Sequence, residues 1–535
     1  MASLTPPPAK LLAFGDARGC KEWLNALPLT NIPQAQALVL EALRTLNAAE
    51  VDGLERLKCL ELMRDKVAFL QGEQRSRYFG KTLPLSVNDS NAWTTGRTLL
   101  EEMEAGYRIC LAAATPDAGE IGRLAGLMAQ RIVRYIGTQM LFHAMVYRRF
   151  DPQLWSRLHQ QYLDAEAKGC ALERVKDSLE GDVGGSSVAE TYVQMVLIQA
   201  AFLSEMTAPQ MDFADAILKL WARKVQILAA SPETNRAALD PLVVDLAKPI
   251  GARPQPRGAV LPTQRVLDIE QLSRSMRKRM HGLQAGEDVA TLGLPAEAAS
   301  VDSLTELQRL HKLWCEGAPP RPAAKAASHP NAGLVFGLGE IHFFVSGGKA
   351  FEQPDKRREL TRQEKQDIEV FGRVREQTQS RMVAEFNFTV ESWVVVDEML
   401  GAVRVLRPTT ASRGIAIGRL VGLRLGDTAP FYLGYLSELT HETDGRIIAT
   451  MTIFPGKPEP IAVRAGDARN RANAQWMQGF RLPALEKLKI EESLIVPGGM
   501  GSRGRGIEAW NEGAKESTVE SVLYHGSDFD RVTIF

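Results

Sequence analysis

The sequence is poor in cysteine and lacks the common arrangements of metal-ligating and nucleophilic residues. Five cysteines occur among 535 residues, no two are close together, and the last is Cys315. This spacing excludes a local zinc motif and a disulfide framework, so we expect reduced thiols. The eight histidines form no HExxH pair and no GxSxG elbow is present. We therefore expect neither a metal site nor an enzyme.

The chain also lacks an excess of charge and a long apolar run. Sixty-four basic residues balance sixty-four acidic ones. This excludes broad electrostatic capture of nucleic acid, although three arginines beside Trp476 in 464–476 leave a base-stacking surface open as an alternative. The longest apolar stretch, Val193–Phe202, is too short to cross a bilayer. The first residues have no basic segment followed by an apolar core, so we expect a cytoplasmic protein without membrane insertion.

The first 230 residues have helical periodicity. In 33–48, leucines recur at helical spacing behind Asn31 as the expected N-cap and Pro33 in the first turn. Further helices are expected at 53–74, 92–114, 119–148, 151–167, 187–206 and 209–230. Short loops between long amphipathic helices favour antiparallel neighbours, so this part predicts a helical bundle or short solenoid.

The sequence pattern changes twice after residue 230. Residues 231–263 are rich in Pro and Gly, helical signal returns in 264–286 and 303–317, and 318–332 has the composition of a linker. Beyond it about ten short runs alternate with period two, and Asp444-Gly445 predicts a hairpin turn. The fold class expected is multidomain α + β, with a helical N-terminal part and one or two C-terminal antiparallel β-barrels.

The expected domains are a helical domain (1–230), a mixed, mainly helical middle region (231–317), a linker (318–332) and a β-rich part (333–535). Within the β-rich part, "GMGSRG" (499–504) formally matches GxGxxG. A dinucleotide fingerprint requires a helix directly after it, whereas the β-type run "RGIEAW" follows here. We interpret the stretch as a glycine turn between strands.

The run "DKRRELTR" (355–362) is the strongest candidate for a binding site. By composition it is typical of a solvated helix face. Arg358 and Arg362 are four residues apart, so on a helix they share one face, and in an extended segment they flank a ligand. Guanidinium groups bind phosphate in bidentate fashion and stack on purines. The pair therefore predicts a site for a nucleotide with several phosphates.

An RxxxR element shortly before a small antiparallel barrel resembles the PilZ domain, the bacterial receptor module for cyclic di-GMP. The resemblance implies that Arg358 and Arg362 hold the guanine and phosphate groups, with extra positive charge from Arg357. The family's second element, [D/N]xSxxG, is echoed in "WVVVDEMLGAVRV" (393–405), where Asp397 and Gly401 would form the opposing contact. Met399 stands in the place of the serine, and the glycine comes one residue early. Each lost polar contact costs about 1–3 kcal/mol of binding free energy.

The layout of most of 20–535 is similar to large multidomain PilZ proteins of proteobacteria. The phrases that carry this likeness include "NALPLTNIPQAQALVLEALRTLN", "RVLDIEQLSRSMRKRMHGL" and "GRLVGLR". The resemblance implies a cyclic di-GMP-responsive effector that uses no cofactor and passes the signal through its helical region to a protein partner. It points to motility, pili or exopolysaccharide as the process, without choosing among them.

The sequence leaves two alternative functions open. One is an adaptor or scaffold that keeps the barrel fold but binds no nucleotide. The other is an enzyme or a nucleic-acid-binding protein without a known motif.

Overall fold

The computed structural model of the chain describes residues 12–115, 117–231, 242–254, 261–317, 322–354, 388–426, 429–466, 475–511 and 513–535. The chain divides into two compact units. Unit 1 comprises Met1–Lys81 and Leu85–Pro320, and unit 2 comprises Thr82–Pro84 and Arg321–Phe535. The division after Pro320 falls inside the predicted linker, and the finer separation of 231–317 from the helical domain remains a prediction.

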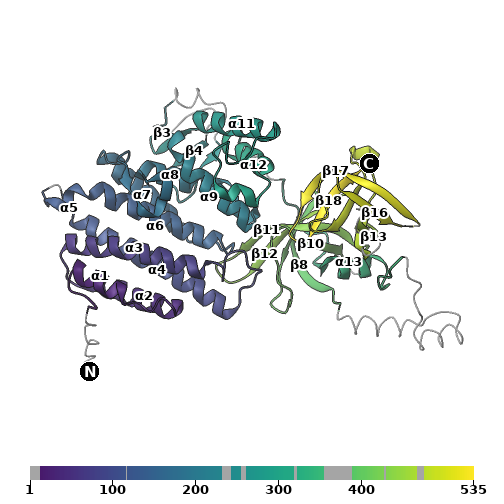
Figure 1. Cartoon of the computed structure of the whole chain (residues 1–535), viewed down its shortest axis with the longest axis horizontal. Helices are drawn as coiled ribbons and strands as arrows, with labels where there is room; N and C mark the ends of the chain where they lie inside the picture. The colour runs from purple at the N-terminus through teal and green to yellow at the C-terminus, as the bar shows by residue number, and fades with distance from the viewer. Residues whose placement is uncertain are drawn as a thin grey trace, which may run out of the picture. The chain divides into compact units, whose positions relative to one another are not determined.

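Unit 1 is built mainly from helices that pack side by side (Figure 1). Their bounds are α1 (Ala17–Asn25), α2 (Ile32–Ala48), α3 (Gly53–Arg75), α4 (Val87–Ala113), α5 (Glu120–Arg123), α6 (Ala125–Ala144), α7 (Gln153–Ala167), α8 (Val188–Ala200), α9 (Ala208–Trp221), α11 (Glu270–Gln284) and α12 (Ser303–Cys315). Helix α4 packs against α2, α3 and α6, and α6 packs against α7 and α8. No helix within the described ranges is long and apolar enough to cross a membrane.

Side-chain caps mark where several of these helices begin. The Asn31 side chain accepts a hydrogen bond from the backbone N–H of Gln34, with a proline in the first turn, which confirms the cap predicted from the sequence. Ser187 and Glu190 form a capping box at the start of α8. Each cap satisfies backbone N–H groups that would otherwise lack partners at the helix end.

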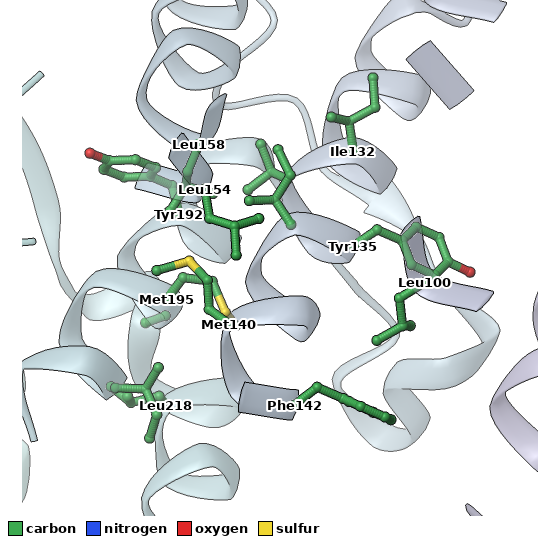
Figure 2. Packing of buried hydrophobic residues seen from close by; sticks show 14 of the residues in the cluster. Leu100, Ile132, Tyr135, Met140, Phe142, Leu154, Leu158, Tyr192, Met195 and Leu218 are labelled. Carbon is green, nitrogen blue, oxygen red and sulfur yellow. The ribbon is translucent and has the colours of Figure 1, made fainter. Parts of the chain in front are cut away.

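A central part of the core of unit 1 lies where α4, α6, α7 and α8 meet. Figure 2 shows Leu100, Tyr135, Met140, Tyr192 and Met195 among the side chains that fill it. Helix α8 is buried nearly all round, which explains why its sequence is mainly apolar on every face. The core is continuous from the first helix to α12.

Unit 1 also contains a small antiparallel sheet. Its strands, in the order β3-β6-β4-β5, are β3 (Gln226–Ala229), β6 (Gln264–Asp268), β4 (Leu242–Asp245) and β5 (Arg253–Pro254). A two-stranded ribbon, β1 (Val175–Lys176) with β2 (Gly185–Ser186), precedes α8. Beyond the sheet, Trp314 on α12 is buried, and its indole N–H donates to the Leu197 carbonyl on α8 at 2.8 Å.

Unit 2 consists of two closed six-stranded barrels joined in sequence. The first has the order β10-β11-β12-β9-β8-β7 and is formed by β7 (Asn331–Phe336), β8 (Glu391–Met399), β9 (Ala402–Leu406), β10 (Leu420–Leu425), β11 (Tyr432–His441) and β12 (Ile447–Ile453). The second has the order β13-β14-β15-β18-β17-β16 and is formed by β13 (Glu459–Ala465), β14 (Met477–Leu482), β15 (Ser493–Pro497), β16 (Gly506–Trp510), β17 (Ala514–His525) and β18 (Phe529–Ile534). All pairings are antiparallel, so the predicted fold class is confirmed.

Two glycine turns behave as the sequence predicted. Gly445, between β11 and β12, has φ +88°, which suits a hairpin turn. The "GMGSRG" stretch connects β15 to β16, and a strand follows it. The carboxylate of Asp530 accepts from the backbone N–H groups of Gly499 and Gly501, both at 2.8 Å, and thereby holds this turn in place.

The two barrels share one hydrophobic cluster. Leu420 and Leu433 of the first barrel pack with Phe480, Ile495 and Phe529 of the second. A short helix, α13 (Leu338–Val345), contributes Ile341 to the same cluster. The sequence pattern predicted neither α13 nor β7.

We expect Phe480→Ala to destabilise both barrels together. Phe480 is fully buried in the shared cluster, and truncating a buried phenylalanine costs about 3–5 kcal/mol. Hydrogen exchange of the full chain would measure this as faster exchange in β10 and β11 as well as in β14. Met477→Ala, an exposed position on the same strand, is the control. Faster exchange in the second barrel alone would show that the barrels unfold independently.

Candidate functional site

The residues predicted to bind an anion fall into two groups. Arg357, Arg358 and Arg362 lie outside the described residues. Asp397 and Gly401 lie within them, on the hairpin formed by β8 and β9 of the first barrel.

The β8–β9 hairpin has a bulge and a glycine turn. Its register shifts between Val395 and Asp397, so Asp397 is paired with Arg404 across the hairpin. Gly401 has φ +73°, a conformation that favours glycine, and its carbonyl accepts from the Ile453 N–H at 2.9 Å. The local role of Gly401 is thus to turn the chain and join it to β12.

The carboxylate of Asp397 is engaged by Arg404. The Arg404 Nε donates to Asp397 Oδ1 at 2.9 Å, and Nη2 contacts Oδ2. This two-point contact raises the pKa of Arg404. The side chain of Asp397 is 13% exposed and that of Arg404 is 39% exposed. The hairpin therefore presents a paired, partly accessible arginine rather than a free carboxylate.

A pocket that sequence reasoning missed lies beside α13, close in sequence to the arginine run. Its volume is about 370 Å³. It is lined by His342, Ser346, Lys349, Ala350, Phe351, Glu352, Pro354, Pro460, Ile461, Ala462 and Trp510. Pro354 is three residues before Arg357 in the chain. The pocket combines the aromatic side chains of Phe351 and Trp510 with one ammonium group, Lys349, and one carboxylate, Glu352. The two rings suit a planar ligand.

Gln353, which lies between two residues that line this pocket, is held by hydrogen bonds to Trp476. The Gln353 side chain donates to the Trp476 carbonyl and accepts from the Trp476 N–H, both at 3.0 Å. The Arg464 guanidinium lies 4.2 Å from the centroid of the Trp476 ring and donates to Glu508 at 2.8 Å. Because Trp476 is only 3% exposed, it offers no face to a nucleic acid base. The base-stacking alternative at this tryptophan is therefore wrong.

His342 is the buried polar residue of the pocket. Its ring lies 5.4 Å from that of Phe351 and 5.6 Å from that of Phe480. Burial lowers the pKa of His342 to about 4. The histidine is therefore neutral at pH 7. Across the described ranges, no group of three or more His, Cys, Asp or Glu residues is placed to hold a metal ion.

We expect His342→Gln to reduce the acid sensitivity of unit 2. The folded-state pKa of about 4 lies below the ordinary value of 6.5, so the unfolded chain takes up a proton first as the pH falls. The free energy of unfolding therefore falls as the pH drops from 6.5 toward 4, by about 2 kcal/mol between pH 7 and pH 5. Calorimetry of the full chain at both pH values would show a smaller fall in Tm for the variant.

The control for this experiment is His329→Gln, since His329 is exposed. It should retain the wild-type fall in Tm. Equal falls in wild type and both variants would contradict the buried, neutral state of His342.

Comparison with known proteins gives two likenesses. Residues 18–233, which lie within unit 1 apart from Thr82–Pro84, match the family described as "Cyclic-di-GMP receptor FimW, N-terminal domain". The protein named Cyclic-di-GMP receptor FimW, from Pseudomonas aeruginosa, is 23% identical to this chain over 351 residues. That alignment covers 65% of this chain and 56% of the relative, so the chain matches little more than half of the relative's length. In sequence, this chain is similar to a cyclic di-GMP receptor, most clearly in its helical unit.

Proposed function

We propose that the protein is a cytoplasmic cyclic di-GMP-responsive effector, which binds the dinucleotide in its β-rich unit and signals to a protein partner through its helical unit. The observation that carries this proposal is the likeness to a protein named as a cyclic di-GMP receptor. The described barrels are compatible with a PilZ-like receptor module. The role proposed is binding rather than catalysis.

Arg358 and Arg362 are the proposed ligand clamp, with Arg357 adding positive charge. Cyclic di-GMP carries two phosphates and two guanine bases, and arginine binds both kinds of group. The pocket that Pro354 lines supports this position, because it lies a few residues before the arginine run in the chain. Phe351 and Trp510 offer two rings there, and Lys349 offers a positive charge next to the carboxylate of Glu352. An aromatic ring stacks on a base at little cost in conformational entropy.

Asp397 and Gly401 are proposed as the opposing contact. Because Asp397 is bound to Arg404, we propose that the two side chains act together. Gly401 would place the hairpin tip close to the ligand backbone, since it has no side chain.

The helical unit is proposed as the surface that contacts the partner. Residues 18–233, which resemble the named N-terminal domain, contain none of the barrel strands. A partner that binds this part of the chain does not need to contact the proposed ligand site.

We expect the full chain to bind cyclic di-GMP and the double variant Arg358→Ala/Arg362→Ala to bind at least tenfold more weakly. Removing two guanidinium groups that contact phosphate removes charge-assisted hydrogen bonds, which are among the strongest polar contacts. Isothermal titration would measure both dissociation constants, with GTP as the ligand control. Arg373→Ala/Arg375→Ala removes the same charge about 15 residues further along the chain and should bind as wild type does. Equal binding by the two double variants would refute the clamp.

The second candidate function is an adaptor that binds no nucleotide. Met399 at the position of the family's serine favours it, because a thioether cannot replace the hydroxyl as a hydrogen-bond donor. Absence of heat on titration of the wild-type chain with cyclic di-GMP would select this function.

A further inference from the structure

A group of cationic side chains lies in unit 1 where helix α11 packs against the 3-10 helix η3 (Ala222–Lys224) (Figure 1). The group consists of Arg223 and Lys224 on η3 and of Lys278 and Arg279 on α11. We call these four residues the basic cluster. It shares no residue with the barrels or with the candidate site beside α13.

Two cations of the basic cluster meet at the same neighbours. The Lys224 Nζ donates to the Ser275 Oγ on α11, and the Arg279 Nη1 donates to the Ser275 carbonyl at 3.3 Å. Both cations also lie near the centroid of the Trp221 ring, Lys224 Nζ at 5.8 Å and Arg279 Cζ at 5.1 Å. Ser275 and Trp221 therefore hold an ammonium and a guanidinium group side by side.

Among the residues that the structure describes, no carboxylate neutralises this pair. The printed hydrogen bonds of Lys224 and Arg279 go to a hydroxyl group and to backbone carbonyls. Burial, followed by the like charges of Arg279 and Arg223, lowers the pKa of Lys224. A charge that is partly removed from water and lies beside like charges gains free energy when an anion approaches.

Arg223 and Lys278 extend the cluster toward solvent. Both side chains are exposed, and neither forms an ion pair within the described ranges. Lys278 is three residues after Ser275 and four after Arg274, so these residues share one side of α11. Arg274 is engaged by Glu270 and adds little net charge. The cluster is thus a local excess of positive charge in a chain whose formal net charge is zero.

The surroundings of the cluster do not suit a lipid surface. On α11, Leu272 and Met276 are buried, and Met280 and Leu283 are partly buried. No large apolar side chain of α11 or η3 is exposed within the described part of the chain. A helix that lies in a membrane interface needs an exposed apolar face, which α11 lacks.

The exposure of the inner pair limits the shape of an anion that can reach it. Lys224 and Arg279 are only partly exposed, whereas Arg223 and Lys278 are fully accessible. A carboxylate at the end of a flexible side chain is narrow enough to enter, and it forms charge-assisted hydrogen bonds with both guanidinium and ammonium groups. Several carboxylates in succession would contact the inner and the outer cations together.

We propose that the basic cluster binds an acidic segment of a protein partner, with several Asp or Glu side chains in succession. Carboxylates of that segment accept hydrogen bonds from Lys224 and Arg279, and Arg223 and Lys278 attract the neighbouring carboxylates. The inference rests on the proposed contact between the helical unit and a partner, and it specifies the charge of the surface that the partner presents.

The test uses the purified full chain and a fluorescein-labelled hexaglutamate peptide as the probe. Fluorescence anisotropy should show binding at about 50 mM salt that weakens at least about tenfold at about 300 mM, because salt screens charges at a protein surface. Hexaglutamine has the same length without the charge, and it should not bind.

Lys224→Gln/Lys278→Gln should bind hexaglutamate at least about tenfold more weakly than wild type, because one inner and one outer cation are lost. Glutamine retains an N–H group that can donate to Ser275. Lys21→Gln/Lys168→Gln removes the same charge from two exposed positions of unit 1 outside the cluster and should bind as wild type does. Should the first variant fail to fold, Arg223→Gln/Lys278→Gln alters only exposed side chains and should also weaken binding.

Absence of hexaglutamate binding, or equal affinity of the cluster and control variants, would overturn the inference. Tighter binding of phosphatidylglycerol vesicles or of a DNA duplex, at equal concentrations of negative charge, would overturn it in favour of a lipid or nucleic acid surface. Titration of the same preparations with cyclic di-GMP separates the two proposals. Hexaglutamate binding without cyclic di-GMP binding supports the basic cluster and contradicts the proposed ligand, whereas the reverse result contradicts the basic cluster alone.

Discussion

Burial of Arg64, Arg131 and Asp177 is the constraint on which the helical unit depends. Each of these side chains is at most 3% exposed, and removing a charge from water costs several kcal/mol unless the protein supplies partners. Arg131 finds an acceptor for every N–H group, including Gln130 Oε1 at 2.8 Å and the Lys176 carbonyl at 2.9 Å. Because these partners come from α3, α6 and the segment before the 3-10 helix η1 (Ser178–Val183), the network fixes how those elements pack.

In the β-rich unit the constraint is the free strand edge that an open sheet leaves. Closing each sheet into a barrel leaves no long free edge for association with other chains. Six-stranded barrels have little interior space, and much of the hydrophobic burial lies where the two barrels and α13 meet. A ligand that alters one barrel at this shared cluster would therefore be felt by the other.

Local patterns in the sequence predicted local structure well. The period of 3.6 located the long helices, the Asn31 cap marked a helix start, and Asp444-Gly445 marked a hairpin, since each depends on neighbouring residues alone. Strand β7 was missed because its partners, β8 and β10, are about 60 or more residues away and a proline-rich segment precedes it. The pocket beside α13 was missed for the same reason, since its lining comes from segments far apart in sequence. The pairing of Arg404 with Asp397 could not be predicted from local pattern, because it depends on the register set by the bulge.

The Asp397–Arg404 pair has a consequence for any anion that reaches the first barrel. Such an anion meets an arginine already neutralised by a carboxylate, so its arrival exchanges one negative partner for another instead of filling an empty positive site. An exchange of this kind changes the net charge of the hairpin little unless the carboxylate swings into solvent. Selectivity would then rest on shape and hydrogen-bond geometry, because the hairpin itself exerts little long-range attraction on a phosphate.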